Sequence, residues 1–349
     1  MPDEAPLPDP SVVPAGSPAP ADAPSPGSRS SGTTPQESVL AVREEVGKLV
    51  VGQDGVLSGL VAALLVRGHV LLEGVPGVAK TLLVKALAAS LDLRTTRVQF
   101  TPDLMPSDVL GQTILDPSAG PGGFRFREGP VFTNLLLADE INRTPPRTQS
   151  ALLEAMEERQ VTSDGVTRPL PDPFVVVATQ NPIEYEGTYP LPEAQLDRFL
   201  FKLVVGYPSA EQEHAILVRH DAGQVPHDVS ESAIRAVAGP TELAAARAQV
   251  EAIRCEAQVV AYIVGLVRAT RDSPSLTLGV SPRGATMLLR AAKAWAWLSG
   301  RDFVTPDDVK AMARSTMRHR IALRPEVELE GGTADGVLDG LLATVPVPR

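Results

Sequence analysis

Eight consecutive residues have the types and spacing needed to hold a triphosphate. The run Gly74-Val75-Pro76-Gly77-Val78-Ala79-Lys80-Thr81 follows a short apolar stretch and opens a helical pattern. Backbone N–H groups in such a loop point inward, and the helix N-terminus adds positive potential. We predict that Lys80 contacts the β- and γ-phosphates of ATP and that Thr81 binds Mg²⁺. The predicted nucleotide contacts are Val75, Pro76, Gly77, Val78, Ala79, Lys80, Thr81 and Leu82.

One position departs from the general phosphate-loop pattern, which has glycine where this chain has Ala79. A single methyl group is a mild change there, provided that the backbone keeps a negative φ. The alternative is an ordinary strand-turn-helix connection without a ligand.

Two further apolar runs end in polar residues that suit phosphate chemistry. Residues 134–138 are followed by Asp139, a predicted Mg²⁺ ligand, and by Glu140, placed to activate a water molecule. Residues 175–179 lead to Asn181, which we predict orients that water. For Asn181 the alternative is a turn-forming residue before Pro182.

Short apolar runs alternate with helical patterns between residues 37 and 204, which predicts an α/β fold with a parallel sheet flanked by helices. Residues 111–127 and 160–166 read instead as β-hairpins. After residue 208 the strand signals stop and helical patterns follow. We predict three parts: a disordered Pro/Ala/Ser-rich tail (1–35), an α/β nucleotide-binding domain (36–207) and a helical domain (208–349).

The composition restricts the function further. Of 349 residues, 32 are Lys or Arg and 42 are Asp or Glu, so the net charge is 32 − 42 = −10 and nucleic acid is an unlikely partner. The five histidines lack the spacing of a zinc site. Long apolar runs and an export signal are absent from the sequence, and the single Cys255 suits a reducing compartment. We expect a cytoplasmic protein without a membrane span.

Four segments together resemble the MoxR family of AAA+ ATPases. They are residues 139–146, 151–158, 178–182 and 191–199, and the resemblance extends over about residues 37–349. It implies an AAA+ P-loop core with an all-α lid, assembled into a homo-oligomeric ring, most simply a hexamer. Members of this family often have alanine in the phosphate loop, as here. The two hairpins match inserts that commonly line the pore of such a ring or face substrate.

The resemblance also assigns roles to single residues. Val51 and Gly52 match positions that pack against adenine. Asn181 matches the polar sensor residue, and Arg283 matches a lid arginine that contacts the γ-phosphate of its own subunit. Arg198 resembles the arginine finger, which acts on a neighbouring subunit. The alternatives are surface pairing of Arg198 with Asp197 or Glu193, and Arg283 as an ordinary helix-start residue. Arg143 is a second candidate for the finger.

The implied function is Mg²⁺-dependent ATP hydrolysis that remodels or activates protein clients. The family resemblance suggests clients with a von Willebrand factor A domain, or clients that receive a metal or cofactor. Two other hypotheses remain open from the sequence: a nucleic-acid remodelling AAA+ motor, and a nucleotide-gated scaffold with little turnover.

Overall fold

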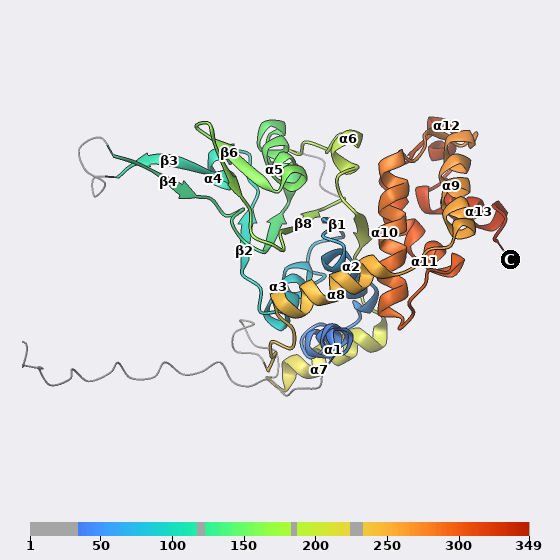
Figure 1. Ribbon diagram of the computed structural model, residues 1–349, viewed down its shortest axis with the longest axis horizontal. Coiled ribbons are helices and arrows are strands. Elements are labelled where there is room, and N and C mark those ends of the chain that lie inside the picture. Colours follow the sequence, from blue (N-terminus) through green and yellow to red (C-terminus); the bar gives the residue numbers. More distant parts are fainter. Residues whose placement is uncertain (1–33, 117–122, 183–186, 224–232, 349) are drawn as a thin grey trace, which may run out of the picture. The chain divides into compact units, whose positions relative to one another are not determined.

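The computed structural model describes residues 34–116, 123–182, 187–223 and 233–348. Within these ranges a five-stranded sheet has the strand order β2-β5-β8-β1-β9 (Figure 1). Each neighbouring pair is parallel, so all five strands end at the same edge. The predicted parallel sheet is confirmed. Its strands are β1 (Val70–Glu73), β2 (Thr95–Gln99), β5 (Leu135–Asp139), β8 (Val175–Gln180) and β9 (Phe201–Val204).

The sheet separates two hydrophobic clusters, because side chains alternate along each strand. Val70 and Leu72 belong to one cluster and Leu71 to the other. Helices cover both faces, as predicted. The first cluster includes residues of α1 (Pro35–Gly47), α2 (Asp54–Leu65) and α3 (Lys80–Ser90), and the second includes residues of α4 (Pro106–Leu110) and α5 (Pro146–Glu158).

The first helix begins earlier than its apolar pattern indicates. Thr34 caps α1, and its hydroxyl and the Glu37 carboxylate satisfy each other's backbone N–H groups. The buried side chains Val39, Val42 and Val46 then fix the helix to the core. Pro35, which we predicted as the last residue of the disordered tail, is therefore the first residue of α1. Residues 1–33 of that tail lie outside the described residues.

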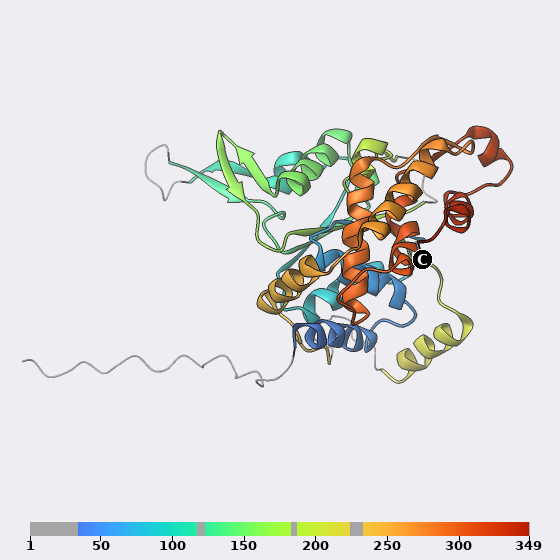
Figure 2. The ribbon, with the colours of Figure 1, turned by 45° about the vertical axis from the view of Figure 1, so that its right-hand side comes forward.

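Both predicted hairpins are present, as β3–β4 (Gly111–Leu115 and Phe124–Glu128) and β6–β7 (Gln160–Ser163 and Val166–Pro169). They lie side by side, away from the helices that follow residue 208 (Figures 1 and 2). The Arg168 guanidinium stacks 3.9 Å from the centre of the Phe126 ring, and the Thr113 hydroxyl donates to Asp164. The hairpins therefore support each other. The turn predicted at 120–123 falls outside the described residues except for Gly123.

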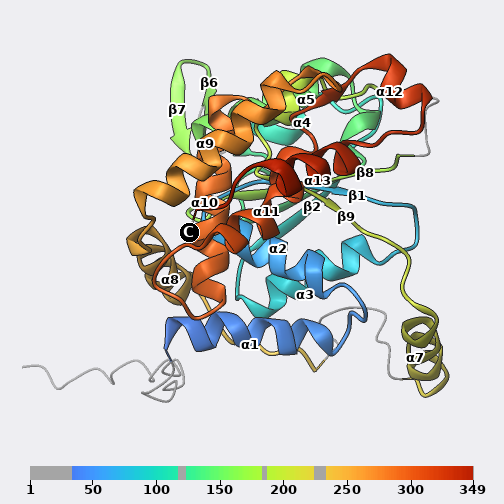
Figure 3. The same cartoon turned by 90° about the vertical axis from the view of Figure 1, so that its right-hand side faces the viewer.

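The segment after residue 208 is mainly helical, and α7 lies apart from the group α9–α13 (Figure 3). The sequence missed α8, α12 and α13, and also a short antiparallel pair of strands, β10 (Leu276–Leu278) and β11 (Ala322–Leu323). Within the described ranges, no helix is both long and apolar enough to cross a bilayer. The division at residue 208 stays a prediction. The helices are α6 (Glu193–Leu196), α7 (Ala210–Asp221), α8 (Pro240–Ala252), α9 (Ala257–Asp272), α10 (Pro282–Leu298), α11 (Pro306–Met317), α12 (Pro325–Leu329) and α13 (Ala334–Thr344).

Candidate functional site

The predicted phosphate loop connects the carboxyl end of β1 to the start of α3. Gly77 has φ +85°, and a Cβ added to Gly74 would lie 2.5 Å from the Val205 carbonyl oxygen. Ala79 has φ +59° and ψ +25°, so the condition under which alanine would be a mild change, a negative φ, is not met. The left-handed conformation places Ala79 directly before the first turn of α3. An alanine there costs about 1 kcal/mol or more of backbone strain.

The Lys80 side chain folds across this loop. Its Nζ donates a hydrogen bond to the carbonyl oxygen of Gly74, at the opposite end of the turn. The ammonium therefore closes the turn between these two residues. The contact of Lys80 with the β- and γ-phosphates stays a prediction.

A cavity of about 230 Å³ adjoins the loop at Gly77 and Ala79. Its remaining lining is largely apolar, which suits a flat base better than a charged group. Val51, a predicted adenine contact, lines it, whereas Gly52 lines a neighbouring cavity of about 500 Å³. The other side of the pocket was not predicted; there α7 contributes Ile216 and, about one helical turn later, Arg219 and His220. The missed lining residues are Pro208, Ile216, Arg219 and His220.

Asp139 and Thr81 converge as a metal site requires. The Thr81 hydroxyl lies 3.5 Å from Asp139 Oδ2, and the Thr179 hydroxyl donates to Oδ1 at 3.1 Å. Hydroxyl and carboxylate oxygens are ligands that Mg²⁺ prefers, so this donor set fits the ion. The Arg97 guanidinium also contacts Oδ2, at 2.6 Å. Sequence reasoning missed Arg97 and Thr179, which lie on the strands at either side of Asp139.

Glu140 follows in a left-handed conformation, with φ +57°. Its backbone N–H donates to the Thr179 hydroxyl at 3.0 Å, and its Oε2 accepts from Gln99 at 2.8 Å. Arg143 contacts the same oxygen at 3.2 Å, so the structure places this candidate finger on an acid of its own chain. Non-glycine residues in this strained region occur at active sites as well as at helix ends and turns.

Asn181 follows β8, the strand between β5 and β1. The sheet order therefore places this buried residue between the acids and the phosphate loop. The preceding Gln180 donates to the Glu73 carboxylate at the end of β1. Three predicted parts of the site thus meet at one edge of the sheet.

Arg198 and Arg283 lie elsewhere. Arg283 pairs with the Glu157 carboxylate, and Arg198 Nε lies 3.9 Å from the same oxygen. Both arginines line a cavity of about 160 Å³ together with His69, which precedes β1. The phosphate loop follows β1, about 13 Å further along the strand direction. We expected Arg283 to lie at the phosphate loop of its own chain, and this is wrong. The structure places Arg283 beside Arg198, at the opposite edge of the sheet.

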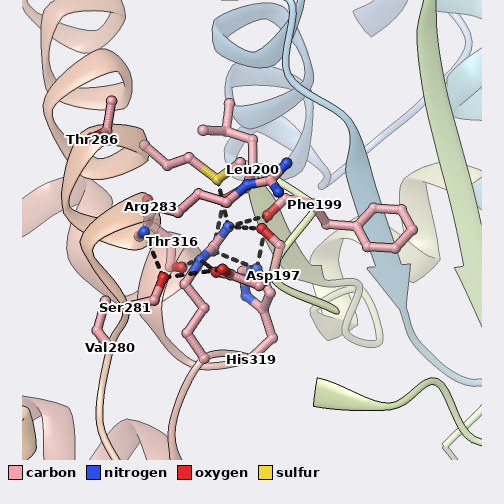
Figure 4. A network of polar contacts seen from close by, with 12 residues as sticks. Asp197, Phe199, Leu200, Val280, Ser281, Arg283, Thr286, Thr316 and His319 are labelled. Carbon is pink, nitrogen blue, oxygen red and sulfur yellow. Dashed lines mark hydrogen bonds and ion pairs between the residues drawn. The ribbon is translucent and has the colours of Figure 1, made fainter. Parts of the chain in front are cut away.

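A buried polar network lies beside these two arginines and joins Asp197, which precedes Arg198, to the start of α10 (Figure 4). The Ser281 hydroxyl, at the start of α10, donates to Asp197 Oδ2 at 3.0 Å. The almost completely buried Arg320 donates to Asp197 Oδ1 at 2.7 Å and to the Phe199 and Leu200 carbonyl oxygens. Burial lowers the Arg320 pKa to about 10, so the side chain remains charged at neutral pH. No pattern in the sequence predicted this network.

Comparison with known proteins agrees with this geometry. Residues 69–201 match the ATPase family associated with various cellular activities (AAA), and residues 268–340 match an AAA lid domain. The chain is 42% identical to Chaperone MoxR1 of Mycobacterium tuberculosis, over 87% of this chain and 81% of that protein. The chain belongs to the MoxR family of AAA+ ATPases. The MoxR resemblance seen in the sequence is therefore confirmed, and with it the ATPase activity.

Two further relatives support the same MoxR assignment. The uncharacterized protein YeaC of Bacillus subtilis is 48% identical over 87% of this chain and 93% of its own length. A crystal structure of a candidate ATPase from Cytophaga hutchinsonii superposes with a TM-score of 0.82 at 40% identity. It covers 90% of this chain and 96% of that protein. The fold of a MoxR-type AAA+ core with a helical lid is thus shared along most of the chain.

Proposed function

We propose that this chain forms a ring in which ATP hydrolysis drives the remodelling of client proteins. One observation supports the proposal of a ring: the phosphate loop and the Arg198–Arg283 pair lie at opposite edges of one sheet. A single subunit cannot apply both to one nucleotide. A neighbouring subunit can, if it presents its arginine edge to the phosphate-loop edge of the next, and such a head-to-tail contact closes into a ring.

Each predicted residue then has a distinct task in hydrolysis. Glu140 accepts a proton from the attacking water, which Asn181 orients. Lys80 balances charge on the β- and γ-phosphates from within the subunit. Mg²⁺, held by Thr81 and Asp139, would neutralise phosphate charge. Arg198 and Arg283 of the adjacent subunit stabilise the charge that develops on the γ-phosphate.

Protein clients fit the chain better than nucleic acid does. The net charge of −10 opposes a phosphate backbone, and the relative MoxR1 is named a chaperone. We extend that chaperone role to this chain, with von Willebrand factor A domain proteins as the client class that the family resemblance suggests. A hexamer and a cytoplasmic location belong to the same proposal.

Capture with a hydrolysis-deficient variant tests the client class. Glu140→Gln removes the proton acceptor and leaves the phosphate loop intact, so this variant should hold clients in the ATP state. Lys80→Ala is the matched control, because it loses the phosphate contact. We expect protein partners with Glu140→Gln and ATP but not with Lys80→Ala. Recovery of nucleic acid without protein would favour a nucleic-acid remodelling motor. Absence of ATP turnover in the wild type would favour a nucleotide-gated scaffold.

A further inference from the structure

Five cationic side chains line a further cavity, which adjoins the one that holds Arg198 and Arg283 and shares Arg67, Arg159 and Arg290 with it. This cavity measures about 110 Å³ and lies against the end of α2. Among its lining residues in the described part of the chain, Glu251 is the one acid. The cationic residues are Arg67, Arg159, Arg247, Arg290 and Lys293.

Part of this positive charge has a structural explanation. Three of the arginines donate to carbonyl oxygens at the end of α2, namely Arg247 to Leu64 at 3.0 Å, Arg290 to Val66, and Arg159 to Arg67 at 3.3 Å. A helix C-terminus carries about half a negative charge, so cations are favourable there. The Asp172 carboxylate adds a further counter-charge, 2.9 Å from Arg67 and 3.4 Å from Arg247.

These partners do not neutralise the positive charge around the cavity. Two carboxylates and one helix end supply about two and a half negative charges against five positive ones. Arg247 NH2 and Arg67 Nε are buried without a hydrogen-bond partner among the described residues. A buried charged donor without a partner is costly to a fold. Burial, together with repulsion from Arg67 and Arg159, lowers the Arg247 pKa to about 10.

The size and chemistry of the cavity define what would restore the balance. Its volume equals that of about three to four water molecules, at roughly 30 Å³ each. A tetrahedral oxyanion fits this space, whereas sites for larger ligands measure roughly 300 Å³ or more. Guanidinium groups also match the geometry of phosphate oxygens. We propose that Arg67, Arg159, Arg247, Arg290 and Lys293 form a binding site for one free inorganic oxyanion, phosphate or sulfate.

Thermal unfolding in inorganic phosphate tests this site, with sodium chloride at the same ionic strength as the reference. The measurements use the Lys80→Ala background, because the phosphate loop itself attracts phosphate. Arg159→Gln combined with Lys293→Gln removes two cations that line the cavity. Arg254→Gln is the matched control, since this exposed arginine pairs with Asp302 at the surface.

We expect phosphate, but not chloride, to raise the unfolding temperature of the Lys80→Ala protein and of its Arg254→Gln control. The double variant should bind phosphate at least tenfold more weakly in calorimetric titration. Absence of a phosphate-specific rise in Lys80→Ala would overturn the proposal, and so would unchanged phosphate affinity in the double variant. Neither result depends on ATP hydrolysis, so the ring proposal is tested separately.

Discussion

Arg198 and Arg283 meet on the carboxylate of Glu157, although one precedes β9 and the other begins α10. Asp197 and Ser281, the neighbours of these arginines, are joined by a hydrogen bond of 3.0 Å. The core and the helical segment after residue 208 therefore present the two guanidinium groups as one unit. A change in nucleotide state that moves the lid of one subunit would move both.

Both arginines should matter for turnover and not for nucleotide binding within the subunit. We expect Arg198→Ala and Arg283→Ala each to lower kcat by about 10³-fold or more, the effect of an arginine supplied in trans. The affinity of the unassembled subunit for a fluorescent ATP analogue should stay within error of wild type. A loss of that affinity with kcat preserved would place the arginines in the subunit's own site.

The Ser281–Asp197 bond should affect kcat through positioning. Ser281 also caps α10, since its hydroxyl accepts from the Gly284 N–H at 3.1 Å. Ser281→Ala should cost about 1 kcal/mol of stability from the lost cap and lower kcat without changing KM. Thr333→Ala removes a comparable cap from α13, because the Thr333 hydroxyl accepts from the Gly336 N–H at 3.1 Å. Equal effects of both variants on kcat would show that the bond has no positioning role.

Ala79→Gly should stabilise the protein. The left-handed backbone at Ala79 strains any residue with a Cβ, so glycine should raise the free energy of unfolding by about 1 kcal/mol. Ala244→Gly, at an exposed position within α8, should instead lower it by about 1 kcal/mol. Denaturant unfolding measures both. Destabilisation at both positions would contradict the strained loop.

Stability should fall on the acid side of neutrality because His69 is buried in its neutral form. The Val176 N–H donates to Nδ1 at 2.9 Å, so Nε2 carries the proton shared with the Met156 carbonyl at 3.1 Å. Burial lowers the His69 pKa from 6.5 to about 4. The unfolded chain takes up a proton first as pH falls, so the contribution is complete above pH 6.5 and is lost progressively toward pH 4.

The measurement is the free energy of unfolding at pH 7.5 and pH 5.0. His69 should account for a loss of about 2 kcal/mol between these values. His69→Gln should reduce the pH dependence by that amount, whereas the exposed His214→Gln should leave it unchanged. An unaltered pH dependence in His69→Gln would mean that the buried imidazole is not the cause.

The parts of the site that the sequence predicted are those encoded by neighbouring residues. Lys80 and Thr81 follow a strand and open a helix, and Asp139 ends a buried strand, so local pattern alone brings them to one sheet edge. The left-handed φ of Ala79 was missed because most phosphate loops have glycine there, where either sign of φ is acceptable.

Contacts between residues far apart in the chain cannot be predicted from a local sequence pattern. Arg97 contacts Asp139, and Arg320 contacts Asp197, only because distant segments pack together. The placement of Arg283 depends on how α10 docks against the core, which the spacing of its own residues does not encode. Helix α8 was missed as well, since one of the four buried residues on its inner face is an arginine, Arg247, which interrupts the apolar pattern.

Mixing two inactive variants tests the shared site most directly. Glu140→Gln keeps its arginines, and Arg198→Ala keeps its phosphate loop and acids, so neither forms a complete site alone. In a randomly mixed ring, about a quarter of the interfaces join an intact Glu140 to an intact Arg198 from the next subunit. We predict that the equimolar mixture regains about that fraction of wild-type ATPase activity. A mixture no more active than the sum of its separate components would contradict a site completed by the neighbouring subunit.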